Sequence, residues 1–260
     1  MSKLVDKLKT TAEGAVPAIG FRVTAKSVKP APILLIAKVA GGRGIDDVAK
    51  SGVDAVLFAK SDSGKMQDVV TKAGDIPCGV ILGNVNGGEI AELKESGCDF
   101  LVSSPVDAPV SVLKEEGLGK ILRIPVSLEM STIRGIGRIG ADAILLVRDE
   151  EKDYITIQFL MACHFMGDAV RKPLMAEVPA GIGSDDITVL WEAGVDGLVI
   201  ESSGKRLKEL RKVINSLPSA AKRRRGGEAA LIPRPSESMT MLGEDDEDED
   251  ENETGLQGDV

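Results

Sequence analysis

The sequence is poor in the residues that build disulfide frameworks, metal centres and membrane spans. Its three cysteines, Cys78, Cys98 and Cys163, are an odd number at wide spacing, which fits neither a disulfide framework nor a CxxC zinc site. A single histidine, His164, excludes a His-rich metal centre and leaves no base for a Ser–His triad outside its own segment. No stretch approaches the roughly 18 uninterrupted apolar residues of a membrane span, and the N-terminus has no signal-peptide run. We therefore expect a cytoplasmic protein with reduced thiols, no bound metal and no membrane partner.

The sequence also lacks an excess of basic residues, and its negative charge is concentrated in one segment. The formal net charge is −9, and the segment from Glu244 to Glu253 holds nine acidic residues and no basic one. The rest of the chain is therefore close to neutral. Binding of nucleic acid requires a basic face that neutralises phosphates, so nucleic acid is not an expected partner.

The character of the chain changes after Leu217. A basic cluster, Lys222-Arg-Arg-Arg225, is followed by two glycines, a proline-containing stretch and the acidic run. Such a composition buries too little apolar surface to repay the entropy of ordering, so we expect residues 218–260 to form a disordered tail. The basic cluster is either a nucleic-acid or targeting patch or part of a solvated linker whose charge the acidic run partly offsets. The tail is also a candidate for contact with a protein partner. The expected organisation is an N-terminal segment, 1–30, a folded domain, 31–217, and this tail.

Eight short apolar runs divide the folded domain. Most are rich in Val, Ile and Leu without polar alternation, as expected for parallel strands covered on both faces. Segments with apolar residues three and four apart lie between them and predict amphipathic helices, clearest at Ile45–Ser51, Glu89–Ser96 and Asp185–Ala193. The eight predicted strands are Ile33–Ala37, Ala55–Ala59, Gly79–Leu82, Phe100–Val102, Ile121–Val126, Ala143–Val147, Leu174–Ala176 and Leu198–Ile200.

An internal repeat supports a closed array of equivalent units. The phrase glycine, any residue, aspartate and then an apolar strand begins at Gly52, Gly97, Gly140 and Gly194, about every 45 residues. The glycine suits the end of a helix and the aspartate suits the tight turn before a strand. Eight strands alternating with helices predict a small (β/α)8 barrel, an α/β TIM barrel, with an open doubly wound sheet as the alternative. The longest insertion, Asp149–Arg171, is expected to contain an extra helix.

In this fold the working residues lie at the carboxyl ends of the strands. Lys60 and Arg148 each lie six residues after the aspartate of their repeat, so we expect them on the same side of their strands, where two cations suit an anionic substrate. Glu129 and Glu177 are candidates for general acid and base, or for structural ion pairs with Lys38 or Lys60. The polar residues at these ends are Lys38, Lys60, Asn84, Ser103, Ser104, Glu129, Arg148, Glu177, Glu201 and Ser202.

The segment from Ala176 to Ile187, with Ala193 to Ser202, resembles the last quarter of the phosphate-binding barrels. These include indole-3-glycerol-phosphate synthase, the histidine-biosynthesis isomerase and cyclase barrels, and several flavin-mononucleotide barrels. In that superfamily a Gly-Ile loop after strand seven and a Gly-Ser pair after strand eight hold a phosphate. Gly181, Ile182 and Gly183 match the first loop, and Ser202 matches the serine of the second.

The sequence also departs from that pattern at two places. Glu201 stands where the second loop usually has glycine, and a carboxylate there repels a phosphate unless it turns away. The likeness to the indole-glycerol-phosphate enzyme extends to Lys38, Glu129 and Glu177, but its lysine after strand three is missing, because that strand ends in Gly83-Asn84. The resemblance therefore holds for the superfamily and not for that enzyme.

The leading functional hypothesis is a cytosolic barrel enzyme, a lyase or isomerase, that binds a phosphorylated small metabolite and needs no cofactor. The resemblance implies that Gly181, Gly183 and Ser202 hold the phosphate, with Arg148 assisting. Lys38, Lys60, Glu129 and Glu177 are the acid–base or Schiff-base candidates, since desolvation makes a lysine usable as a nucleophile. Two alternatives stay open: a flavin-mononucleotide barrel with the same phosphate loops, and a non-catalytic scaffold that binds a partner through its charged tail.

Overall fold

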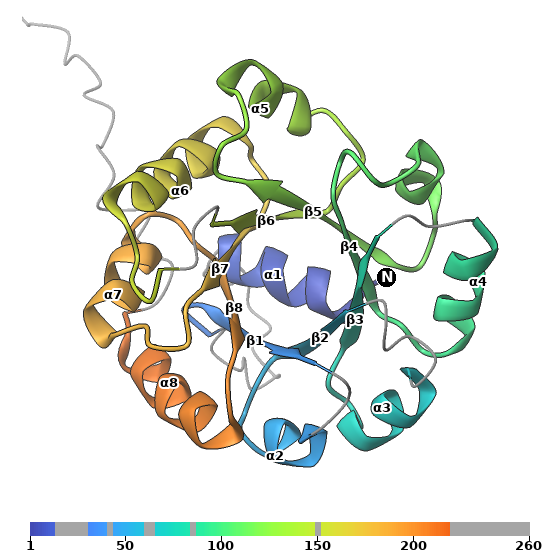
Figure 1. The fold of residues 1–260 in the computed structure, drawn as a ribbon, viewed down its shortest axis with the longest axis horizontal. Helices are drawn as coiled ribbons and strands as arrows, with labels where there is room; N and C mark the ends of the chain where they lie inside the picture. Colours follow the sequence, from blue (N-terminus) through green and yellow to red (C-terminus); the bar gives the residue numbers. More distant parts are fainter. Residues whose placement is uncertain (14–30, 41–43, 60–65, 84–86, 149–151, 219–260) are drawn as a thin grey trace, which may run out of the picture. The chain divides into compact units, whose positions relative to one another are not determined.

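The chain forms a closed barrel of eight parallel strands (Figure 1). The computed structural model describes residues 1–13, 31–40, 44–59, 66–83, 87–148 and 152–218. Each strand pairs with the next and β8 pairs with β1, which confirms the predicted (β/α)8 barrel and excludes the open sheet. The strands are β1 (Leu34–Val39), β2 (Ala55–Ala59), β3 (Cys78–Leu82), β4 (Phe100–Ser103), β5 (Gly119–Pro125), β6 (Ala143–Val147), β7 (Leu174–Val178) and β8 (Gly197–Glu201).

Helices surround the barrel on its outer side (Figure 1). A 3-10 helix, Val110–Lys114, takes the place of an α-helix between β4 and β5. The insertion between β6 and β7 does contain a helix, α6, but α6 is the ordinary crossover helix of that unit and not an additional one. The helices of the ring are α2 (Ile45–Ala49), α3 (Met66–Ala73), α4 (Gly87–Glu95), α5 (Met130–Ile136), α6 (Ile157–Ala169), α7 (Ser184–Glu192) and α8 (Gly204–Ser216).

Alternation along each strand separates two apolar layers. Successive side chains of a strand point to opposite faces, so every second residue faces the barrel interior. On β1, for example, Leu34 and Ile36 pack inside the barrel, while Leu35 and Ala37 pack against the helices. The interior is filled by side chains and is not a channel, as is usual for this fold.

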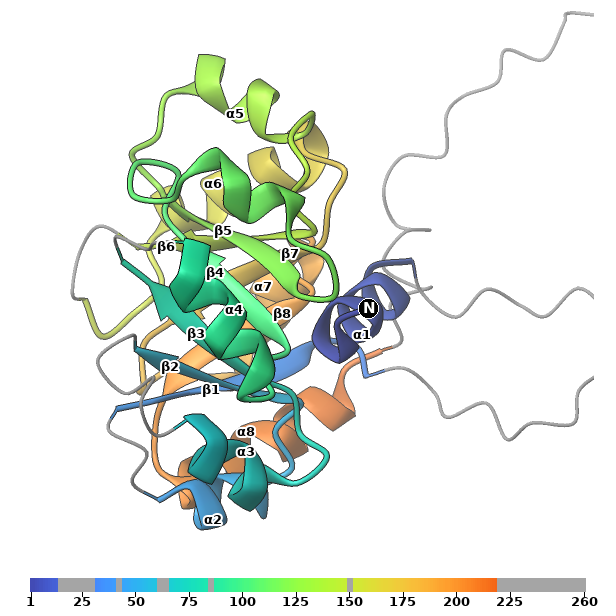
Figure 2. The same cartoon turned by 90° about the vertical axis from the view of Figure 1, so that its right-hand side faces the viewer.

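One further helix, α1 (Lys3–Glu13), closes the barrel at the amino ends of the strands (Figure 2). Leu4 and Leu8 are fully buried and belong to the same apolar cluster as the interior side chains of the strands. The start of α1 lies close against β5, since a Cβ atom added to Gly119 would lie 2.7 Å from the side chains of Ser2 and Val5. The sequence predicted only an N-terminal segment here, because eleven residues with few large apolar side chains do not reveal which surface they cover.

The aspartates of the repeat organise the same end of the barrel. Asp54, Asp142 and Asp196 each accept a hydrogen bond from the backbone N–H of the neighbouring strand, at Leu35, Lys120 and Leu174. The fourth, Asp99, instead accepts three hydrogen bonds of 2.7–3.0 Å from the Ser2 hydroxyl and the N–H groups of Lys3 and Leu4. A carboxylate in this position satisfies the free N–H groups at the start of α1 and complements its helix dipole. The repeat therefore marks the end of the barrel opposite the catalytic end of this fold class.

The predicted tail, 218–260, lies outside the described residues except for Pro218. Among the described helices, none combines the length and the apolar character that a membrane span requires.

The role of α1 predicts that Leu8→Ala lowers the free energy of unfolding by about 2–5 kcal/mol, because it opens a cavity among fully buried side chains. Urea denaturation measures the change. Lys3→Ala, which truncates an exposed side chain on the same helix, serves as control and should change stability by less than about 0.5 kcal/mol. Equal effects of the two substitutions would contradict the closure of the barrel by α1.

Burial predicts inert thiols in the native protein. It raises the pKa of Cys78, Cys98 and Cys163 from 9.0 to about 12, so all three stay protonated at pH 8, and the thiolate is the reactive form. Labelling with Ellman's reagent should be slow for the native protein and fast in denaturant. The free energy of unfolding should also fall as pH rises above about 9, since unfolded thiols then lose protons that native thiols keep. Rapid labelling of the native protein would contradict this account.

Candidate functional site

Four charged side chains meet at the carboxyl ends of the strands, above the apolar interior. Lys38 Nζ lies 2.7 Å from Glu177 Oε1 and 3.9 Å from a carboxylate oxygen of Glu201. The other oxygen of Glu177, Oε2, lies 3.8 Å from a terminal nitrogen of Arg123. The Glu177 carboxylate is therefore held between two cations, and the Lys38 ammonium between two carboxylates. We name this group the mouth cluster.

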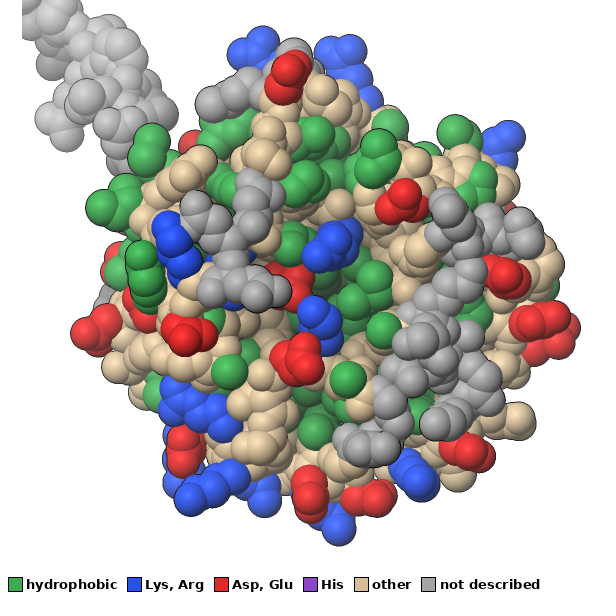
Figure 3. All heavy atoms as spheres, viewed as in Figure 1, with side chains coloured by type: hydrophobic (Ala, Val, Ile, Leu, Met, Phe, Trp, Pro, Cys, Tyr) green, Lys and Arg blue, Asp and Glu red, His purple; other side chains and the backbone are tan. Residues whose placement is uncertain are grey.

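Strand alternation places all four side chains inside the rim of the barrel. Lys38 is two residues beyond Ile36 on β1, and Arg123 is two residues beyond Ile121 on β5, where both isoleucines fill the interior. Glu177 is two residues beyond Met175, an interior residue of β7. Lys38 and Glu201 are direct partners in the β1–β8 register. Figure 3, which views the barrel along its axis, shows acidic and basic side chains together in the central opening, with hydrophobic side chains around them.

The mouth cluster combines partial burial with access to solvent. The side chains of Glu177 and Lys38 are 19% and 29% exposed, whereas Arg123 and Glu201 are 41% and 63% exposed. Charged groups that are half withdrawn from water interact more strongly than exposed ones and are costly unless paired. A paired lysine and carboxylate at the open end of a barrel can exchange protons with a bound molecule or polarise its oxygen atoms.

The structure brings two of the predicted catalytic residues together, Lys38 and Glu177, in the ion pair that the sequence offered as an alternative role for Glu177. Glu129 is the exposed N-cap residue of α5, beyond the end of β5. Lys60 lies outside the described residues. Arg123 was not predicted, because it lies within β5 and the sequence pattern marks only the polar residues at strand ends. A lone arginine at an inward position of an apolar strand was the signal that would have identified it.

The predicted phosphate loop, Gly181 to Gly183, precedes α7. The N–H of Gly183 donates to Asp186 Oδ2 at 3.1 Å, and the Ile182 N–H donates to the carbonyl of Pro179. Arg206 of α8 donates to the carbonyl of Ile182 at 2.6 Å and holds this loop in place. The first turn of α7 carries Asp185 and Asp186, so its positive dipole end already has acidic partners.

Ser202 has a different setting. It is half-buried and lies directly after Glu201 and before Ser203, the N-cap residue of α8. The first turn of α8 contains no acidic residue, and the free N–H groups of a helix start attract anions. Ser202 is therefore the predicted phosphate-binding residue whose surroundings best suit an anion on this side of the mouth.

Arg148 is directed away from the barrel interior. Val147, the residue before it, packs inside, so Arg148 lies on the other face of β6. Its guanidinium donates to the carbonyl oxygen of Lys152 and lines a cavity of about 220 Å³ at the start of α6. Gly181 lies near this segment, since a Cβ atom added to it would be 3.6 Å from the carbonyl oxygen of Asp153.

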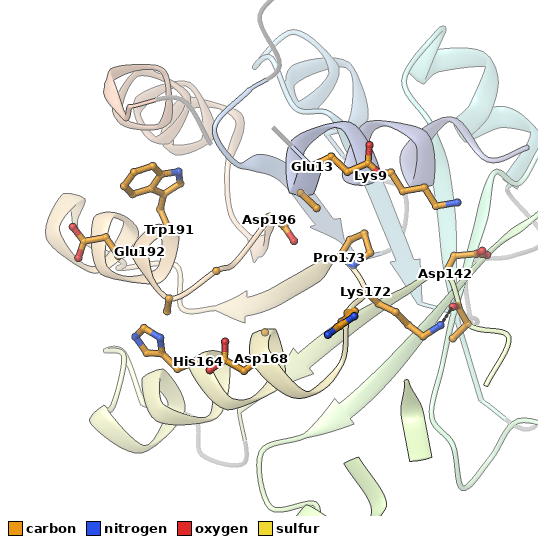
Figure 4. Close-up of a pocket in the computed structure, with 16 residues that line it drawn as sticks. Lys9, Glu13, Asp142, His164, Asp168, Lys172, Pro173, Trp191, Glu192 and Asp196 are labelled. Carbon is orange, nitrogen blue, oxygen red and sulfur yellow. Dashed lines mark hydrogen bonds between the residues drawn. The ribbon is translucent and has the colours of Figure 1, made fainter. Parts of the chain in front are cut away.

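A larger depression, of about 1190 Å³, lies at the opposite end of the barrel (Figure 4). It is bordered by the end of α1, by α6 and by α7, and its lining includes His164, Asp168 and Trp191. Active sites of this fold lie at the carboxyl ends of the strands, so the size of this depression does not make it the working site.

Within the described ranges, no three His, Cys, Asp or Glu side chains are grouped in a way that would hold a metal ion. The two carboxylates of the mouth cluster flank the Lys38 ammonium, and Glu177 also faces Arg123, an arrangement that suits hydrogen bonding to a substrate better than metal ligation.

Comparison with solved structures supports the fold. A mutant tryptophan synthase alpha subunit from the hyperthermophile Pyrococcus furiosus is similar, with a TM-score of 0.56 and 13% identity, over 70% of this chain and 96% of that one. Mycobacterium tuberculosis tryptophan synthase is similar too, with a TM-score of 0.56 and 12% identity, over 70% of this chain and 91% of that one. No family model matches the sequence, and no curated protein matches it either. The chain thus has the (β/α)8 barrel expected from the superfamily resemblance, and at this identity the likeness concerns the fold alone.

The geometry of the mouth cluster predicts strong coupling between Lys38 and Glu177. In a double-mutant cycle of Lys38→Met and Glu177→Gln, measured by urea denaturation, we expect a coupling energy of about 1–2 kcal/mol, between the values of exposed and buried pairs. The exposed Arg206–Glu209 pair on α8, at 3.1 Å, is the matched control and should couple by less than about 1 kcal/mol. A coupling no larger than that of the control would show that the mouth cluster is not a linked unit.

Proposed function

We propose that this protein is an enzyme that acts on a small phosphorylated metabolite at the mouth of its barrel, in a lyase or isomerase reaction. The observation that carries the proposal is the mouth cluster, in which Lys38 and Glu177 are paired at 2.7 Å on two inward-facing strand ends. An ion pair adds little to the stability of a barrel that its apolar layers already support. Its position at the end of the barrel where substrates bind in this fold favours a catalytic role.

Lyases and isomerases of small metabolites need a proton removed at one atom and delivered at another. Glu177 is placed to accept a proton from a substrate carbon or hydroxyl group, because its two oxygens are held by Lys38 and Arg123 in a fixed orientation. Lys38 is placed to donate a proton or a hydrogen bond to an oxygen atom that gains negative charge. A carbonyl substrate would also give Lys38 the option of a Schiff base.

The phosphate group has a suitable place beside this pair. Ser202 and the first turn of α8 offer a hydroxyl and free N–H groups, and Arg123 is an exposed cation within the mouth. Glu201 lies 3.9 Å from Lys38, so part of its charge is neutralised when a phosphate approaches. The resemblance to the phosphate-binding barrels supports the same assignment for Ser202. The resemblance supports binding of a phosphate group, and it does not specify the reaction or the metabolite.

The alternative functions make different demands. A flavin-mononucleotide barrel would use the same phosphate position and would be yellow when purified. A non-catalytic scaffold would need neither Lys38 nor Glu177, and would contact its partner through the charged tail. Solved relatives in fold include the tryptophan synthase a2b2 complex of Pyrococcus furiosus, at a TM-score of 0.51, so assembly with a partner protein is compatible with this architecture.

The proposal predicts that a phosphorylated metabolite stabilises the full chain in a thermal-shift screen of sugar phosphates, flavin mononucleotide and inorganic phosphate. At 100 times its dissociation constant a ligand adds about 2.7 kcal/mol to the free energy of unfolding. Ser202→Asp should abolish the shift by charge repulsion, while the same substitution at the exposed far end of α8, Ser216→Asp, should leave it unchanged. Glu177→Gln should keep the shift and lose at least about a hundredfold in turnover of the compound identified.

Three outcomes would contradict the proposal. If no phosphorylated compound shifts the melting temperature, the scaffold function is favoured and the tail becomes the segment to test. A shift with flavin mononucleotide alone, together with a yellow protein, favours the flavin barrel. Full turnover in Glu177→Gln would remove the mouth cluster from the chemistry.

A further inference from the structure

Helix α6 differs from an ordinary helix of the ring in its composition. Its inner face, with Phe159, Cys163 and Met166, is buried in the apolar layer between strands and helices. Only one of its 13 residues, Asp168, is charged at neutral pH, whereas α8 has the same length and carries six charged residues. A surface helix places charged and polar residues toward water, and a helix that is apolar on all sides belongs in an environment that covers it. The outer side of α6 therefore has the composition of a covered surface.

The outer side of α6 is nevertheless exposed in the single chain. Ile157 and Met161 are 78% and 66% exposed, and Tyr154, just before the helix, is 58% exposed. Figure 3, in the same view as Figure 1, shows hydrophobic side chains on the outer surface over α6. Exposed residues separated by four, three and four positions share this side of the helix, and we name them the outer face of α6: Ile157, Met161, His164 and Asp168.

Charges beside the two ends of α6 show which partner fits this face. Asp153 precedes the helix and Arg171 follows it; both are exposed, and neither is ion-paired with another described residue. When two copies of a helix pack in opposite directions, the start of one lies beside the end of the other. Asp153 of each copy then faces Arg171 of the other copy, and a two-fold axis forms this pair of opposite charges twice.

Asp168 favours the same arrangement. It lies in the last turn of α6, where a negative charge opposes the helix dipole, while the first turn carries no acidic residue. Antiparallel packing moves Asp168 of each copy to the start of the other helix, where a negative charge is favourable. Parallel packing would instead place like charges side by side. The charges therefore specify a second copy of this helix in the opposite direction.

The spacing of the outer face is also compatible with itself. Separations of four, three and four residues read the same from either end of the helix. A two-fold axis between Met161 and His164 thus brings the face of one copy onto the same face of the other, as an isologous interface requires. Ridges formed by residues three and four apart are the elements that pack when helices meet.

We propose that the outer face of α6 is the interface of a homodimer, in which α6 of a second copy of this chain packs across it in the antiparallel direction. One helix of about 20 Å from each copy makes the contact, so the interface lies at the small end of specific interfaces, with a dissociation constant on the order of micromolar. The mouth cluster takes no part in it, so this proposal does not depend on the proposed function.

Sedimentation velocity of the full chain tests the proposal, at concentrations from roughly 1 to 500 µM. We expect a monomer–dimer equilibrium. Met161→Glu should raise the dissociation constant about a hundredfold or more, because each dimer buries the new charge twice. Val110→Glu is the matched control, since it places the same charge at a 73% exposed valine between β4 and β5 and should leave the equilibrium unchanged.

Charge reversal tests the antiparallel direction and provides a second measurement if Met161→Glu does not fold. Asp153→Arg places like charges opposite each other at both ends of the interface and should weaken dimerisation about tenfold at low salt. Combining it with Arg171→Asp restores opposite charges and should recover most of the lost affinity. Both positions are exposed, so these substitutions should leave the stability of the monomer nearly unchanged.

A monomer at every concentration would overturn the proposal. Association that persists in Met161→Glu would also overturn it, because another surface or the charged tail would then be responsible. If the doubly substituted chain dimerises no better than Asp153→Arg, the antiparallel arrangement is wrong and the proposal falls with it.

Discussion

Strand alternation within a closed barrel is the constraint on which the rest of this structure depends. Because eight strands close on themselves, every second side chain must fit a shared interior, and small or apolar residues fill it from the amino ends upward. The pattern changes toward the carboxyl ends of four strands, where Lys38, Arg123, Glu177 and Glu201 occupy inward positions. The same rule that builds the core therefore gathers four charges from strands far apart in the sequence. These residues need no flexible loop to meet, since the strands themselves hold them.

The polar residues at the two ends of the barrel have different roles. At the amino ends, the repeated aspartates satisfy backbone N–H groups, and Asp99 fixes the start of α1 over the apolar interior. At the carboxyl ends, charges remain paired with each other yet reachable from solvent. The helix starts at this end also differ: α7 supplies its own acidic residues, whereas α6 and α8 do not. Of the predicted phosphate-binding residues, the Gly181–Gly183 loop precedes a helix with acidic residues in its first turn, whereas Ser202 precedes one without them.

Much of the barrel was predictable, because apolar runs and a glycine–aspartate repeat report local structure directly. The predicted runs at Ala55–Ala59 and Ala143–Val147 coincide with β2 and β6, and α2, α4 and α7 lie within a residue or two of the three helices that apolar spacing predicted. The position of α1 was not predictable, since its buried residues Leu4 and Leu8 contact strands more than twenty residues away. Lys38 and Glu177 were found as strand-end residues, but their pairing depends on barrel closure, which brings β1 next to β8 and within reach of β7. Arg123 was not predicted, because it lies inside a strand and is distinguished only by its inward direction, which the sequence does not show directly.

The central claim is that the mouth cluster is where this protein binds and transforms a phosphorylated compound. The most direct test is a crystal structure of the full chain with the phosphorylated compound that stabilises it most. The account predicts that the reacting carbon or oxygen of the compound lies within hydrogen-bonding reach of Glu177 and Lys38, about 2.6–3.2 Å or one water molecule away. A compound bound only in the depression between α1, α6 and α7, or with no atom near either side chain, would contradict it.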